Sequence, residues 1–200
     1  EPYRRQRQMC IRDSLFPDTY RFYMGEDPKT VLNKMIANFD RKFTDDMRQQ
    51  AADMGYSVRD IVNIASMIEK EAKKADFAKV SAVFHNRLDQ GMMLQSDPTV
   101  HYVTGERRMA LRQSDLAVDS PYNTYKVSGL PVGPICNPSP EAINAALYPD
   151  ESYVAEKYLY FCSKDPSTGE LHFSRTLEEH ERAVAIYAPL WKAYDEERGM

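Results

Sequence analysis

The chain has 200 residues, of which 42% are apolar and 28% are charged. This length and composition suit one globular domain with one hydrophobic core. The net charge of −4 argues against a nucleic-acid-binding protein, which usually carries a basic surplus. Three cysteines, Cys10, Cys136 and Cys162, are too few for a disulfide-rich scaffold. Either two free thiols or one bridge between Cys136 and Cys162 fits this count. No apolar run reaches the roughly 20 residues of a membrane span, so we expect this piece of chain to be soluble.

The first segment, residues 1–14, shows no apolar periodicity. We expect it to be a disordered or non-native leader. Ordered structure is expected to begin at Leu15, with a loop that leads into a short extended segment ending near Phe22.

Three helices are predicted in the first half of the chain. The first begins at Asp27-Pro28, where apolar residues start to recur at helical spacing: Val31, Met35, Ile36, Phe39 and Phe43. A polar stretch with no predicted element follows. Ser57 and Asp60 then form a capping box for a second helix, which ends in the charged run at 69–71. The third carries one apolar face and stops at Gly91: Phe77, Val80, Phe84 and Leu88.

The second half of the chain mixes extended and helical signals. Residues 92–105 predict extended structure interrupted at Asp97-Pro98, and a short helix is predicted near 112–118. Residues 120–140 form a long irregular region with five prolines, and its aromatic and apolar residues favour a functional loop over disorder.

A helix is predicted to begin at Ser139-Pro140-Glu141. Residues 158–164 and 171–176 bracket a turn and predict a β-hairpin. Thr176 and Glu179 form a capping box for the last helix, which Pro189 should kink. The predicted fold class is therefore α+β, with mixed helices, short strands, and a C-terminal β-hairpin followed by a helix.

Two glutamates close the second predicted helix. Glu69 and Glu71 lie on opposite shoulders of that helix, because each residue turns it by about 100°. At most one of them therefore faces any given cleft, and periodicity does not decide which. Both could also be solvated charges on a surface helix.

Two further segments carry groups suited to binding sugars. If residues 94–102 form a strand, Gln95, Asp97 and Thr99 share one face, although Asp97-Pro98 could instead form a turn. In the long loop, Asn123 and Tyr125 offer an amide and a phenol of the kind that binds sugar hydroxyls, although the loop could also be purely structural. The four histidines include no pair at i, i+4, and no glycine-rich phosphate loop is present, so no metal or cofactor is predicted.

Taken in order, five stretches resemble the endolytic murein transglycosylases of the MltG (YceG-like) type. They are LFPDTYRF, IASMIEKEA, VFHNRLDQGMMLQSDPTVHY, SPYNTYKVSGLPVGPICNPS and YLYFCSKDPSTGELHFSRTLEEH. The resemblance extends from Leu15 to the last helix and implies that residues 15–200 are a catalytic domain of this type. Family members usually carry a membrane helix and a LysM-like region ahead of that domain, and this chain shows neither.

The resemblance implies that Glu71, the second glutamate of the E-K-E run, is the catalytic acid. It also implies that Gln95, Asp97, Asn123 and Tyr125 line a glycan cleft. The implied reaction is endolytic cleavage of the MurNAc–GlcNAc β-1,4 bond, with formation of 1,6-anhydro-MurNAc ends and without a cofactor. The implied setting is the outer side of the bacterial cytoplasmic membrane, to which the full-length protein is anchored. The implied partners are peptidoglycan glycan strands and cell-wall synthases.

Two alternatives remain open from the sequence. A hydrolytic muramidase would use Asp97 as a second carboxylate. A non-catalytic glycan-binding module would keep the cleft but would not depend on Glu71.

Overall fold

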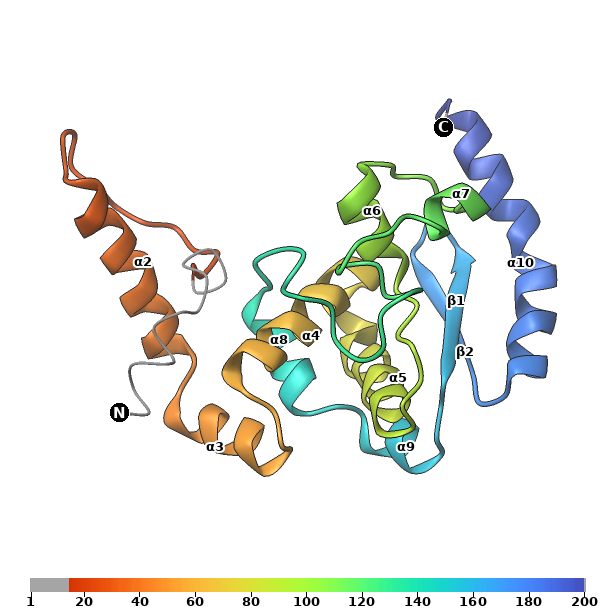
Figure 1. The fold of residues 1–200 in the computed structure, drawn as a ribbon, viewed down its shortest axis with the longest axis horizontal. Coiled ribbons are helices and arrows are strands. Elements are labelled where there is room, and N and C mark those ends of the chain that lie inside the picture. Colours follow the sequence, from red (N-terminus) through yellow and green to blue (C-terminus); the bar gives the residue numbers. More distant parts are fainter. Residues whose placement is uncertain (1–14, 200) are drawn as a thin grey trace.

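Helix α4 (Val58–Glu71) is the central element of the fold in the computed structural model, which describes residues 15–199. The leader expected at residues 1–14 lies outside the described residues. Ser57 and Asp60 form the predicted capping box, and every residue from 61 to 68 is buried. A helix buried on all sides must be surrounded by other elements, and α4 accordingly packs against α3, α5, α6 and α8 (Figure 1).

Two helices precede α4. Helix α2 (Pro28–Lys42) begins where predicted, with Asp27 accepting a hydrogen bond from the Thr30 amide. It stands at one side of the molecule (Figure 1) and joins the core through aromatic residues near its C-terminal end. Helix α3 (Asp45–Asp53) was not predicted, because its sequence is polar and Ala51 is its one buried residue. Its start is nevertheless marked by the side chain of Thr44, which caps the Met47 amide.

Helix α5 (Phe77–Asp89) follows α4 after a short 3-10 turn, η3 (Lys74–Asp76). Of the predicted apolar face, Phe77, Val80 and Phe84 are buried and Leu88 is partly buried. The chain leaves the helix through Gly91, whose φ of 66° is in the left-handed region.

Residues 97–104 correct the sequence-based prediction. They form helix α6 (Asp97–Thr104) and not a strand. Pro98 lies in the first helical turn, where the missing amide hydrogen is not needed, and Gly105 ends the helix with φ 75°. The Asp-Pro pair therefore starts a helix here. The short helix predicted near 112–118 is α7 (Gln113–Leu116).

The long region predicted at 120–140 contains no helix or strand up to residue 139. It leads into α8 (Pro140–Leu147), which Ser139 caps through the Ala142 amide, and then into α9 (Glu151–Ala155).

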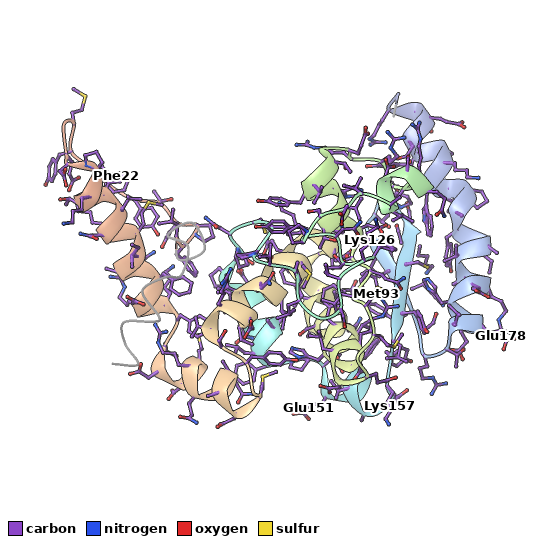
Figure 2. The ribbon with its side chains drawn as sticks, in the orientation of Figure 1. Phe22, Met93, Lys126, Glu151, Lys157 and Glu178 are labelled. Atoms are coloured by element: carbon purple, nitrogen blue, oxygen red, sulfur yellow. The ribbon has the colours of Figure 1, made fainter. Side chains whose placement is uncertain are left out.

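The C-terminal part is the predicted hairpin and helix. Strands β1 (Tyr160–Asp165) and β2 (Glu170–Ser174) pair antiparallel, with Cys162 opposite His172. Helix α10 (Leu177–Glu197) contains Pro189 and covers the hairpin (Figures 1 and 2). The fold is thus mixed α and β. Within residues 15–199, none of the helices combines the length and apolarity needed to cross a bilayer.

Candidate active site

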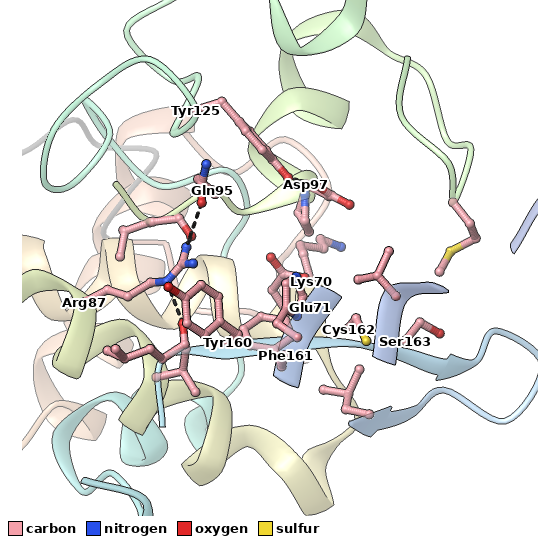
Figure 3. Close-up of a pocket in the computed structure, with 18 of the residues that line it drawn as sticks. Lys70, Glu71, Arg87, Gln95, Asp97, Tyr125, Tyr160, Phe161, Cys162 and Ser163 are labelled. Atoms are coloured by element: carbon pink, nitrogen blue, oxygen red, sulfur yellow. Dashed lines mark hydrogen bonds between the residues drawn. The ribbon is translucent and has the colours of Figure 1, made fainter. Parts of the chain in front are cut away.

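A cavity of about 490 Å³ lies between the C-terminal end of α4, the start of α6 and the hairpin (Figure 3). This volume is within the range of small-ligand sites. The lining side chains come from α4, α5, α6, both strands of the hairpin, α10 and the loops between them. Those that the following paragraphs use are Glu71, Arg87, Gln95, Asp97, Tyr125 and Tyr160.

Glu71 is the last residue of α4, and its carboxyl group lies in the cavity wall. The Ser96 hydroxyl donates a hydrogen bond to Glu71 Oε1 over 2.6 Å. The other oxygen, Oε2, accepts no hydrogen bond from residues 15–199. It is also not one of the fully buried polar atoms that lack a partner, so it is accessible. It is therefore open to a molecule bound in the cavity.

The surroundings of Glu71 favour its protonated form. Burial, followed by the negative charge of Asp97, raises the pKa of Glu71 from 4.5 to about 8. The Ser96 hydrogen bond and the more distant charge of Arg87 act in the opposite direction. Glu71 therefore holds its proton at neutral pH and can donate it.

The carboxyl groups of Glu71 and Asp97 lie at opposite ends of their helices. Glu71 lies at the C-terminal end of α4, where the helix dipole opposes a negative charge. Asp97 is the first residue of α6, where the dipole favours one. The two helix dipoles thus act on the two carboxyl groups in opposite directions.

Asp97 is held in the cavity by Tyr125. The Tyr125 hydroxyl donates a hydrogen bond to Asp97 Oδ1 over 2.5 Å. Burial raises the pKa of Asp97 above its ordinary value, and this hydrogen bond offsets only part of that rise. Burial also raises the pKa of Tyr125, so the phenol keeps its proton and remains a donor.

A buried network of hydroxyl groups fixes the start of α6. Thr99 Oγ1 donates to the Ser96 carbonyl over 2.6 Å and lies 2.9 Å from Thr124 Oγ1. The Ser96 amide donates to Thr124 Oγ1 over 2.8 Å. Because Ser96 contacts Glu71 directly, this network orients the group that touches the candidate acid.

Glu69 points away from the cavity. Its Oε2 accepts hydrogen bonds from the amide and the hydroxyl of Ser139, at 3.0 and 2.5 Å. Ser139 caps α8, so Glu69 ties α4 to α8. The structure thus selects one glutamate for the cavity, which periodicity alone left undecided.

Gln95 lies at the rim of the cavity in a strained backbone conformation. Its φ of 52° is in the left-handed region, which non-glycine residues rarely adopt. Such strain persists only where neighbours enforce it, and it gathers at functional sites. Here the Gln95 amide is held by the Thr124 carbonyl at 3.1 Å.

Asn123 differs from the expectation that it lines the cleft. It is 1% exposed, and its amide nitrogen donates to the carbonyls of Leu116 and Val118 at 3.0 and 2.7 Å. Its oxygen accepts from the Tyr125 amide at 3.0 Å. These contacts occupy the side chain inside the loop, so it does not reach the cavity. Of the residues predicted for the site, Glu71, Gln95, Asp97 and Tyr125 are brought together.

Comparison with known proteins identifies the family. The model of the YceG-like family matches residues 4–186. The chain belongs to the YceG-like family. The matched range begins inside the segment of residues 1–14 that the sequence analysis set apart.

Two curated relatives and one solved structure resemble this YceG-like chain. The endolytic murein transglycosylase of Bacillus subtilis (strain 168) is 41% identical over 86% of this chain and 47% of that protein. The endolytic murein transglycosylase of Streptococcus pneumoniae serotype 2 is 32% identical over 86% of this chain and 31% of that protein. The chain thus spans half or less of these relatives. The crystal structure of a YceG-like protein from Listeria monocytogenes has a TM-score of 0.75 and 40% identity, over 85% of this chain and 54% of that one.

The YceG-like cavity also contains residues that the sequence analysis did not single out. Arg87 is buried on the core face of α5, which should have been a signal, because a charged residue there replaces an expected apolar one. Tyr160 from β1 and His180 from α10 stack with their ring centroids 5.2 Å apart and line the cavity together. No local pattern could place these two beside Glu71, because tertiary packing brings them there.

The loop at Met109 forms part of the same wall and is tied to α10. Asp195 accepts the amides of Met109 and Ala110 at 2.8 and 2.9 Å. Cys162 also lines the wall, and both Cys136 and Cys162 are free thiols. Burial raises the pKa of Cys162 to about 11, so it remains a thiol.

Proposed function

We propose that this YceG-like domain is an endolytic lytic transglycosylase that cleaves the MurNAc–GlcNAc β-1,4 bond of peptidoglycan and leaves 1,6-anhydro-MurNAc ends. The observation that carries the proposal is the state of Glu71. It keeps its proton at neutral pH and has one oxygen open to a ligand-sized cavity. The names of the two curated relatives, both endolytic murein transglycosylases, support the same substrate.

In the proposed first step, Glu71 Oε2–H gives its proton to the oxygen that links the two sugars. The bond from that oxygen to C1 of the muramyl sugar breaks, and positive charge develops at C1. Asp97 lies in the same cavity, and its ionised form would stabilise this charge. Ser96 stays bonded to Oε1 and supports the new carboxylate of Glu71.

In the second step, the carboxylate of Glu71 takes the proton of the C6 hydroxyl of the same sugar. The C6 oxygen forms the new bond to C1, which closes the 1,6-anhydro ring and regenerates protonated Glu71. One residue thus serves as acid and then as base. Attack within one sugar needs no captured water, because the nucleophile is already tethered.

A hydrolytic muramidase is the second candidate, favoured by one observation. Asp97 is a second carboxyl group in the same cavity and affects Glu71 electrostatically. In that reaction water or Asp97 would attack C1, and the products would be reducing ends.

Mass spectrometry of purified peptidoglycan digested by this domain separates the candidates. The proposal expects muramyl ends that are lighter by one water than hydrolysed ends and resistant to borohydride, in fragments of many lengths. Reducing muramyl ends alone would place the domain with the hydrolases. Strand binding without cleavage by the wild-type domain would favour a non-catalytic glycan-binding module.

The family resemblance also suggests a location and partners. We propose that the full-length protein is anchored in the cytoplasmic membrane, holds this domain on the outer side, and works beside cell-wall synthases. Fractionation of cells that carry the full-length gene tests the location. Crosslinking at exposed positions of the domain, followed by identification of the captured synthases, tests the partnership.

A further inference from the structure

Arg87 is a buried cation with no carboxylate partner among residues 15–199. It is 6% exposed, and the described ion pairs do not include it. Its Nε donates to the Leu159 carbonyl at 2.7 Å, and its Nη1 donates to the carbonyls of Met93 and Leu94 at 3.1 and 2.7 Å. These neutral acceptors offset part of the cost of burying the charge, but they leave it uncompensated.

The remaining nitrogen of Arg87, Nη2, is open to the cavity. It has no acceptor among residues 15–199, and it is not one of the fully buried polar atoms that lack a partner. The ring of Tyr160 covers one face of the guanidinium, with 5.1 Å between Arg87 Cζ and the ring centroid. The open edge of the guanidinium therefore borders the space between Gln95 and Tyr160 (Figure 3).

Gln95 provides a second open donor beside this edge. Its Oε1 accepts from Arg87 Nη1 at 3.4 Å, which directs its amide nitrogen Nε2 away from the guanidinium. That nitrogen has no acceptor among the described residues, and Gln95 is exposed at the cavity rim. The Gln95 backbone is held by its amide hydrogen bond to the Thr124 carbonyl.

The protein's own carboxyl groups do not satisfy Arg87. Glu71 holds a proton at neutral pH, and Asp97 is bonded to Tyr125. Neither forms an ion pair with Arg87 in the described structure. A desolvated guanidinium with a free edge binds carboxylates more strongly than neutral sugar hydroxyls, because the hydrogen bonds are then charge-assisted.

We propose that Arg87 Nη2, with Gln95 Nε2 at the rim, binds a carboxylate on the substituent of the muramyl sugar. This inference rests on the proposed function, because it concerns the same glycan. In peptidoglycan only the muramyl sugar carries a lactyl group, which ends in a free carboxylate or in a peptide stem with carboxylates of its own. A carboxylate site beside Glu71 distinguishes the two alternating sugars and sets which glycosidic bond meets the acid.

Binding measured on the Glu71→Gln variant tests the site without consuming the strand. Soluble glycan strands stripped of stems are compared with the same strands after their lactyl carboxylates are converted to methylamides. Strands that keep their stems are compared in the same way. We expect neutralisation to weaken binding on the order of 10- to 100-fold in at least one pair. The pair that responds identifies the lactyl or the stem carboxylate as the ligand.

Equal affinity within both pairs, or no binding of any strand, would overturn the proposal. The outcome is independent of the proposed reaction, since a digest with reducing ends would change the chemistry but leave a binding difference intact.

Gln95→Glu provides the matched test in the protein. It adds a carboxylate beside Arg87, so the preference for carboxylate-bearing strands should disappear. Gln90→Glu adds the same charge outside the cavity on an exposed residue and should keep that preference. Loss of preference in both variants would contradict the assignment to Arg87.

Discussion

The carboxyl groups of Glu69 and Glu71 point in different directions, although only Lys70 separates them. Glu71 accepts from Ser96 at the cavity wall, whereas Glu69 accepts from Ser139 at the start of α8. Two residues of the same type therefore have different tasks, and this difference can be measured.

Glu71→Gln should abolish cleavage of purified sacculi, because the amide has no acidic proton to give. Glu69→Gln should keep most of the activity and lose about 1 kcal/mol of the free energy of unfolding, since a neutral oxygen accepts more weakly from Ser139. Turnover and urea unfolding of both variants check this. An inactive but stable Glu69→Gln, together with an active Glu71→Gln, would reverse the assignment.

Glu71 should also make stability depend on pH. Its pKa is raised to about 8 from 4.5, so the folded state holds the proton more tightly than the unfolded state. The contribution of Glu71 to the free energy of unfolding is fully present below about pH 4.5 and is lost as pH rises through about 8. Relative to Glu71→Gln, the wild type should therefore become less stable across that window, by on the order of a few kcal/mol. Urea unfolding of both proteins through the window measures the difference. A difference that does not change with pH would show that Glu71 is ionised at neutral pH.

Asp97→Asn should shift the activity profile toward lower pH. The charge of Asp97 helps to raise the pKa of Glu71, so its removal lowers that pKa and the acid is lost at a lower pH. The alkaline limb of kcat/KM reports the change. Asp119→Asn removes one charge from an exposed residue outside the cavity lining and should leave the limb in place. An unchanged limb in Asp97→Asn would mean that burial alone sets the pKa of Glu71.

The sequence predicted the elements that have local signals. The capping residues Ser57, Ser139 and Thr176 begin helices as expected, and the turn at 165–170 joins two strands. It did not predict α3, whose polar sequence offers no apolar stripe. It also misread Asp97-Pro98, because the same pair can open a helix or interrupt a strand, and the hydroxyl network that decides between them is tertiary.

The site was predictable where its chemistry matched a known pattern. Family resemblance selected Glu71, Asp97 and Tyr125, and the structure brings all three to one cavity. The direction in which a loop side chain points has no such signal. Asn123 therefore looked like a ligand-binding residue, whereas its amide is occupied by two carbonyl groups of the chain.

Asn123 and Gln95 should consequently respond differently to truncation. Asn123→Ala removes the donor to the partly buried carbonyls of Leu116 and Val118, which should cost about 1 kcal/mol for each lost hydrogen bond. We expect a clear fall in melting temperature, and a fall in turnover because the loop that carries Tyr125 loosens.

Gln95→Ala removes an exposed side chain, and Arg87 Nη1 keeps its two carbonyl acceptors. Stability should therefore change by less than about 0.5 kcal/mol. Its KM for glycan strands should rise while its melting temperature stays at the wild-type value. Calorimetry paired with turnover on soluble strands measures both effects. A stable Asn123→Ala with a raised KM would show that this side chain contacts the glycan after all.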